Sequence, residues 1–154
     1  MMWTLPRAVT AVAGAGEGGT DLNAFDHALM DAGIADLNFL RVTSICPEGA
    51  RVVPMRPYTP GILMPAVYTR INGHTPGERI AAAVGIGIGV GSFGVIMEYA
   101  HTGSAENAEQ IVRRMVEEAM AARGLKTAEI VVAAREHVVQ RTGCVIAAVL
   151  FWPE

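Results

Sequence analysis

The sequence is poor in the residues that mark several classes of protein. Its two cysteines, Cys46 and Cys144, are too few and too far apart for a disulfide scaffold or a four-ligand zinc site, and its histidines show no ligand spacing. Charged residues make up 18% of the chain and the net charge is −3, so it lacks the basic field that binds nucleic acid or anionic membranes. We therefore expect no metal, no nucleic acid and no membrane partner, and a reducing, cytoplasmic location.

No hydrophobic run is typical of a signal peptide or a membrane span. Pro6 and Arg7 interrupt the N-terminal stretch, which therefore lacks a continuous apolar segment. The segment 80–97 carries no charge, but within 85–91 glycines alternate with isoleucine and valine. A period of two belongs to strands, so the segment predicts two buried strands joined by a turn after the last of these glycines.

What the chain has in abundance is apolar residues and turn formers. Its 154 residues are 51% hydrophobic, with 17 glycines and 8 prolines, which suits one domain over 1–154 with many turns. Helical spacing and capping residues predict helices at 21–32 and 104–123. Strand patterns fall at 8–13, 36–43, 51–53, 62–71, 78–89, 93–100, 128–139 and 143–152. Two helices cannot cover both faces of one large sheet, so we expect an α+β fold with strands packed on strands and helices outside.

A glycine motif lies between the first strand and the first helix. The pattern Gly14-x-Gly16-x-x-Gly19 is found where dinucleotide-binding proteins approach a pyrophosphate. The acidic residue that should follow at the end of the second strand is missing, because Asp36 precedes that strand. A plain tight turn is the favoured interpretation, and nucleotide binding stays open as an alternative.

Two carboxylates interrupt apolar patterns. Asp26 falls on the same helical face as Leu22 and Phe25, so it requires a cationic partner or ligand unless that face lies at a rim open to water. Glu98 shares a strand face with Ile96, where burial would raise its pKa toward the range useful for proton donation. An edge strand with Glu98 in water is the competing interpretation.

Several segments, in order, match a known family. They are 16–26, which contains LNAFD, 38–45 (NFLRVTSI), 96–99 (IMEY), Glu136-His137 and Gly143-Cys144. Together they resemble the pyruvoyl-dependent arginine decarboxylases, over a stretch from about Val9 to Trp152. The combination is far more specific than any one short motif.

The resemblance implies a cofactor that the chain makes from itself, without a metal or pyridoxal phosphate. In that family the serine matching Ser44 attacks the carbonyl of the preceding residue, here Thr43, and elimination and hydrolysis leave a pyruvoyl group. The chain would divide into 1–43 and 44–154. Asn38 matches a residue that assists processing, as an amide donor to the developing oxyanion, and the attack would need Ser44 held against a strained carbonyl. Thr43 stands where serine is expected in much of the family, which affects at most the rate of cleavage.

The same resemblance implies a substrate and an assembly. Glu98 matches the proton donor that acts after CO₂ leaves, and Asp26 matches the residue that pairs with the guanidinium of arginine. The reaction would be decarboxylation of arginine to agmatine, which feeds polyamine biosynthesis. The family fold is an αββα sandwich that forms a homotrimer with active sites at subunit interfaces. The alternatives are a pyruvoyl-dependent decarboxylase of another amino acid, a nucleotide-binding module, and a trimeric scaffold that is never cleaved.

Overall fold

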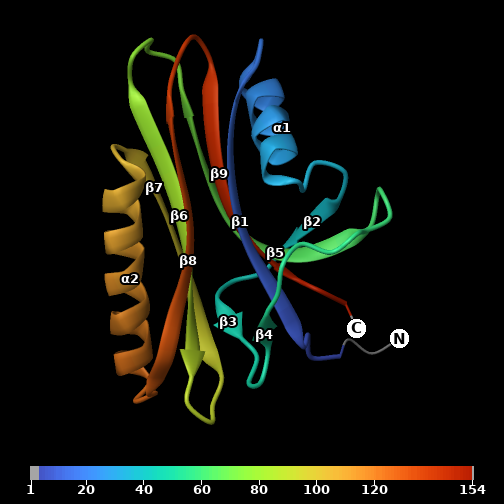
Figure 1. Ribbon diagram of the computed structural model, residues 1–154, viewed down its shortest axis with the longest axis vertical. Helices are drawn as coiled ribbons and strands as arrows, with labels where there is room; N and C mark the ends of the chain where they lie inside the picture. The colour runs from blue at the N-terminus through green and yellow to red at the C-terminus, as the bar shows by residue number, and fades with distance from the viewer. Residues whose placement is uncertain (1–3, 154) are drawn as a thin grey trace.

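Two β-sheets pack face to face in the protein, and one helix covers the outer face of each. The structure is a computed structural model that describes residues 4–153. Figure 1 shows the four layers, with α1 and α2 on opposite sides of the paired sheets. The predicted αββα sandwich is confirmed.

The described residues form two helices and nine strands, close to the predicted positions. The helices are α1 (Asp21–Ala32) and α2 (Ala105–Ala122). One sheet has the order β2-β5-β9-β1-β4, formed by β1 (Ala8–Glu17), β2 (Asn38–Arg41), β4 (Arg51–Val52), β5 (Leu63–Gly73) and β9 (Gly143–Phe151). The other has the order β3-β7-β6-β8, formed by β3 (Ile45–Cys46), β6 (Arg79–Gly89), β7 (Gly94–Thr102) and β8 (Thr127–Val138). Within residues 4–153, neither helix is long and apolar enough to cross a membrane.

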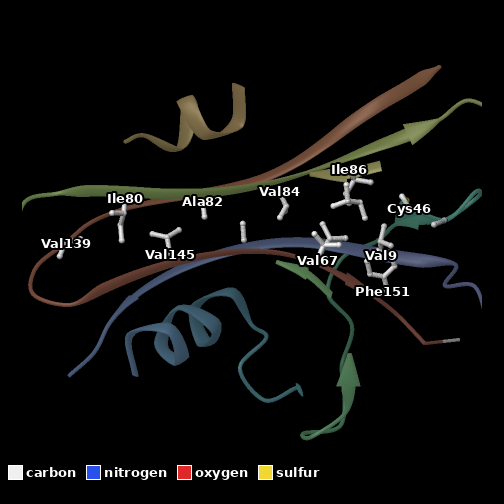
Figure 2. Packing of buried hydrophobic residues seen from close by; sticks show 14 residues of the cluster. Val9, Cys46, Val67, Ile80, Ala82, Val84, Ile86, Val139, Val145 and Phe151 are labelled. Atoms are coloured by element: carbon white, nitrogen blue, oxygen red, sulfur yellow. The ribbon is translucent and has the colours of Figure 1, made fainter. Parts of the chain in front are cut away.

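The main core fills the space between the two sheets. Alternate residues of β6, among them Ile80, Val84 and Ile86, face β9 and β1 across this space, as Figure 2 shows. The intervening glycines of the same strand face α2: a Cβ at Gly85 would lie 2.4 Å from Val112 Cγ1. The alternation of glycine with isoleucine therefore has a packing cause on each face.

The first helix lies directly against β1, and the glycine motif makes this possible. β1 continues through Gly14 and Gly16, which pair with Ile146 and Cys144 of β9, so the predicted tight turn is wrong at these positions. A Cβ at Gly14 would lie 2.4 Å from the Ala28 carbonyl oxygen. These glycines serve close packing of helix on strand, and nothing in this geometry favours nucleotide binding.

The chain crosses from one sheet to the other just after β2. The predicted strand 36–43 is shortened to four residues, Asn38–Arg41, and β3 begins at Ile45 in the opposite sheet. The Val42 amide still donates to the Ala66 carbonyl of β5 at 3.0 Å, whereas the Ser44 carbonyl accepts from the Ile96 amide of β7 at 2.7 Å. The Thr43-Ser44 peptide therefore bridges the two sheets.

Candidate active site

A pocket of about 470 Å³ opens where this crossing meets the neighbouring strands. Its walls come from the crossing segment, β5, β7 and α2. The lining residues are Arg41, Val42, Thr43, Ser44, Tyr68, Thr69, Ile96, Met97, Glu98 and Met115. The volume falls within the range of small-molecule sites, and the pocket contains a hydroxyl nucleophile and a carboxyl group.

Thr43 and Ser44 both line the pocket. Ser44 is half-buried and Thr43 is exposed. A main-chain hydrogen bond from each flank, at Val42 and at the Ser44 carbonyl, holds the junction between the sheets. Among the described residues, every positive φ belongs to a glycine and no peptide bond is cis, so the junction shows neither of these two forms of backbone strain. The junction is therefore held by its anchors in two sheets.

Glu98 lies in the same pocket, two residues along β7 from the strand position that binds Ser44. Ile96 and Glu98 share one face of β7, so their Cα atoms are about 7 Å apart. Glu98 is half-buried, and burial raises the pKa of its carboxyl group above the ordinary value, against the opposing charge of Arg41. The carboxyl group therefore retains a proton to a higher pH than an exposed carboxyl group does, in the same pocket as Ser44.

Arg41, which no sequence motif indicated as a site residue, contributes a positive charge to this pocket. Its Nη2 donates to the Tyr68 carbonyl at 2.6 Å, and its guanidinium carbon lies 4.1 Å from the centroid of the Tyr68 ring. The sequence did contain one indication of a role for Arg41, namely its position two residues before Thr43. The strand β5 that holds it comes from a distant part of the sequence, so the pocket could not be assembled from local pattern.

Asp26 does not lie in this pocket in the same chain. It is exposed on α1, and no partner for its carboxylate is found in residues 4–153. Its expected place in the apolar stripe is wrong: Leu22, used to set that stripe, is itself 68% exposed. The buried residues of α1 are Ala24, Ala28 and Leu29, because the helix packs through small side chains against the glycines of β1.

Asn38 is also separate from the pocket. It begins β2, five residues before Thr43, which corresponds to roughly 16 Å of extended chain. Its Nδ2 donates to the Gly61 carbonyl at 3.2 Å. Within one chain this amide therefore supports the loop before β5, and Asn38 is not among the residues that line the pocket with Thr43.

A larger groove of about 680 Å³ lies on the opposite edges of the sheets, between β1 and β8. Its charged residues include Asp31 and Arg135, which form an ion pair at 2.8 Å. No serine, threonine or cysteine lines it. Nor do residues 4–153 contain a group of three histidine, cysteine or acidic side chains able to hold a metal ion. The smaller pocket at Ser44 is therefore the stronger candidate.

A partly exposed carboxylate, that of Glu17, joins β1 to the β8–β9 hairpin, and no sequence motif indicated this contact. Oε1 of Glu17 accepts from the Arg141 and Thr142 amides at 2.9 and 3.1 Å. Oε2 accepts from the Gln140 amide at 3.1 Å and lies 2.5 Å from Nε2 of His137. The two ends of this contact are more than a hundred residues apart in the chain, so no local motif signals it.

Comparison with known proteins agrees over nearly the whole chain. The family model described as "Pyruvoyl-dependent arginine decarboxylase (PvlArgDC)" matches residues 8–154. Relatives with the name pyruvoyl-dependent arginine decarboxylase include those of Methanocaldococcus jannaschii, 41% identical over 96% of this chain and 91% of the relative. Those of Pyrococcus abyssi and Thermococcus kodakarensis are 40% and 38% identical, each covering 99% of both chains. The chain belongs to the pyruvoyl-dependent arginine decarboxylase family.

Proposed function

We propose that this protein decarboxylates L-arginine to agmatine and CO₂ with a pyruvoyl group made from its own Ser44. The observation that carries the proposal is the shared pocket: it brings a serine at a chain crossing between two sheets together with a carboxyl group on β7 whose pKa is raised by burial. Family membership supplies the chemistry that this arrangement suits. Because the product is agmatine, we propose that the reaction feeds polyamine biosynthesis.

The first chemical step belongs to the chain itself. Oγ of Ser44 attacks the Thr43 carbonyl carbon, the acyl group passes from nitrogen to oxygen, and the peptide becomes an ester. Elimination releases the Thr43 carboxylate and leaves a dehydroalanine, whose hydrolysis releases ammonia and yields the pyruvoyl group. The hydrogen bonds at Val42 and at the Ser44 carbonyl hold the two sides of the cleavage point in different sheets. Both new chain ends would therefore stay in place after cleavage. The products would be 1–43 and 44–154 of a single domain.

The residues around Ser44 suit this group. Ser44 is half-buried and faces a pocket large enough for an amino acid. The pyruvoyl carbonyl supplies the electron sink for loss of CO₂. Met97 and Met115, from β7 and α2, contribute an apolar wall, which lowers access of water to the reacting carbon.

Glu98 is the proposed proton donor. After CO₂ leaves, the substrate carbon needs a proton, and a carboxyl group whose pKa is raised by burial retains one at higher pH than an exposed carboxyl does. Its position two residues from the Ile96 amide that holds the Ser44 carbonyl supports transfer within the pocket.

Asp26 is the proposed partner of the substrate guanidinium, and this role requires a second copy of the chain. In one chain Asp26 lies outside the pocket, while Leu22 and Met30, one turn to either side, are 68% and 60% exposed. Large exposed apolar side chains around a carboxylate are typical of a surface that packs against a partner. We propose a homotrimer in which α1 of one copy completes the pocket of the next. Asn38 would assist processing from a neighbouring copy in the same way.

The experiment is to incubate the purified protein with arginine, ornithine, lysine and aspartate separately and to quantify CO₂ and amine. Agmatine from arginine, at a higher kcat/KM than any other product and absent with Ser44→Ala, is the expected result. A preference for another amino acid would overturn the substrate and retain the cofactor. No amine from any of them, with an uncleaved chain, would favour a trimeric scaffold.

Free, buried Cys46 and Cys144 accord with the cytoplasmic location that we propose.

A further inference from the structure

Arg41 lines the pocket, but the proposed function assigns it no role. Its guanidinium is held in two ways, by the hydrogen bond from Nη2 to the Tyr68 carbonyl and by stacking on the Tyr68 ring at 4.1 Å. The ring is itself packed against Phe39, with 4.8 Å between centroids. An arginine constrained by a carbonyl and an aromatic face is a positive charge at a defined position.

The charges that face Glu98 are few. Its partner across the sheet on β6 is Val84, and the residues that line the pocket from its own strand and from α2 are uncharged. β5 contributes one titratable group, the Tyr68 phenol, and the crossing segment contributes Arg41. Among the described pocket residues, Arg41 is therefore the one cation and Glu98 the one acid.

We propose that Arg41 is a positioning residue for the decarboxylation, acting as the counter-charge that allows Glu98 to release and recover a proton in each turnover. The inference rests on the proposed function. Burial raises the pKa of Glu98, and the Arg41 charge opposes that rise. Without this cation the buried carboxyl group would hold its proton more tightly, whereas a general acid works best when its pKa lies near the working pH.

Cleavage at Ser44 makes the counter-charge more important. It would create the α-carboxylate of Thr43 in the same pocket, a second negative charge that favours the protonated form of Glu98. Arg41 lies two residues from Thr43, and its positive charge offsets the negative charges of the Thr43 α-carboxylate and of ionised Glu98. Arg41 is less suited to binding the substrate α-carboxylate. That negative charge is lost when CO₂ leaves, so a cation that stabilises it would favour the bound substrate over the transition state.

The direct test uses protein that cannot cleave. In a Ser44→Ala background, ¹³C NMR follows the titration of the Glu98 side chain, assigned by its loss in Glu98→Gln. Arg41→Gln should move the Glu98 midpoint to higher pH, and Arg41→Lys, which retains a positive charge, should keep it near that of the parent. Equal midpoints in all three proteins would overturn the proposal. Because Arg41 is exposed, both variants should fold; Arg41→Met, with an apolar stem over Tyr68, gives the same comparison if Arg41→Gln does not.

A second measurement uses the cleaved enzyme. The alkaline limb of the kcat profile should move to higher pH in Arg41→Gln and stay in place in Arg41→Lys. A rise in KM with an unchanged pH profile would instead assign Arg41 to the substrate carboxylate and overturn the proposal. The NMR comparison needs neither cleavage nor turnover, so failure of the proposed function and failure of this inference give different results.

Discussion

Two carboxylates of this protein, Glu17 and Glu98, are both partly shielded from water, and their pKa values shift in opposite directions. Burial by itself would raise the pKa of Glu17, but hydrogen bonds from His137, Arg141 and Gln140 outweigh it and leave the pKa below the ordinary value. Glu98 has no such donors among the described residues, and burial raises its pKa despite the charge of Arg41.

The difference lies both in the number of donors and in the depth of burial, because Glu98 is the more deeply buried of the two. Four donors converge on Glu17, so its charged form is the stable one and it clamps β1 to the hairpin between β8 and β9. Glu98 lines the pocket with Ser44, and burial raises the pKa of its carboxyl group, so it retains its proton to a higher pH than an exposed carboxyl group does. One carboxylate suits structure and the other suits proton transfer.

The largest expected effect comes from removing the proton of Glu98. Glu98→Gln retains the shape of the side chain, so the chain should still cleave at Ser44, but kcat for arginine should fall at least about a hundredfold because general acid catalysis is lost. Steady-state agmatine production checks this. Glu129→Gln, an exposed carboxylate in the same sheet, should leave kcat unchanged. Parental kcat in Glu98→Gln would show that Glu98 takes no part in proton transfer.

Next in size is the loss of the charge at Asp26. Asp26→Asn should lower kcat/KM for arginine by about one to two decades, since a charge-assisted contact to a guanidinium contributes roughly 1.5–3 kcal/mol, and cleavage should proceed normally. Asp36→Asn, also exposed and close to α1 in sequence, is the matched control. If both variants retain parental kcat/KM, Asp26 is only a solvated helix residue.

Glu17 should affect stability and leave chemistry intact. Glu17→Gln weakens four hydrogen bonds and should cost about 2 kcal/mol or more of unfolding free energy, measured by urea denaturation. Glu109→Gln, which removes one surface pair with Arg113, should cost about 0.5 kcal/mol or less. Equal losses in the two variants would contradict the clamp.

The same carboxylate gives a pH dependence of definite sign. Because the folded-state pKa of Glu17 is below the unfolded value, its stabilisation is fully present above an unfolded pKa of about 4.3. It is lost as the pH falls through the folded-state pKa. Urea denaturation from neutral to acidic pH should therefore show a smaller acid-induced loss of stability in Glu17→Gln than in the parent.

The smallest effect tests the glycine motif. An alanine at Gly16 would bring its Cβ within 2.7 Å of the Ala28 amide nitrogen, so α1 must shift, at a cost of about 1–3 kcal/mol. Gly19 has open space around it, and Gly19→Ala should change stability by less than about 0.5 kcal/mol. Thermal unfolding separates the two. Similar melting temperatures would mean that close helix packing is not the reason for these glycines.

The sequence predicted the elements well because their patterns are local. Thr20 and Ser104 cap the two helices, Gly33 ends the first in the left-handed conformation with φ of 80°, and the alternating glycines of β6 lie in a strand as expected. The phase of α1 was not predictable from hydropathy. Its buried face is built from alanines that fit glycines on β1, while Leu22 points outward.

The site was predictable only in part. Thr43, Ser44 and Glu98 follow from family motifs, and the structure brings all three to one pocket. Arg41 and Glu17 acquire their roles from contacts with distant strands, which no local pattern encodes. Asp26 and Asn38 lie outside the pocket in one chain, so their proposed roles depend on a neighbouring copy.

The central claim, that Ser44 is converted into the cofactor, is tested most directly by the denaturing mass spectrum of the purified protein. The account predicts two chains, 1–43 and 44–154, the second with a mass that corresponds to a pyruvoyl group in place of Ser44. Ser44→Ala should remain intact at 16.3 kDa, the mass of the full chain. A parent protein that stays at this single mass after long incubation near neutral pH would contradict the claim.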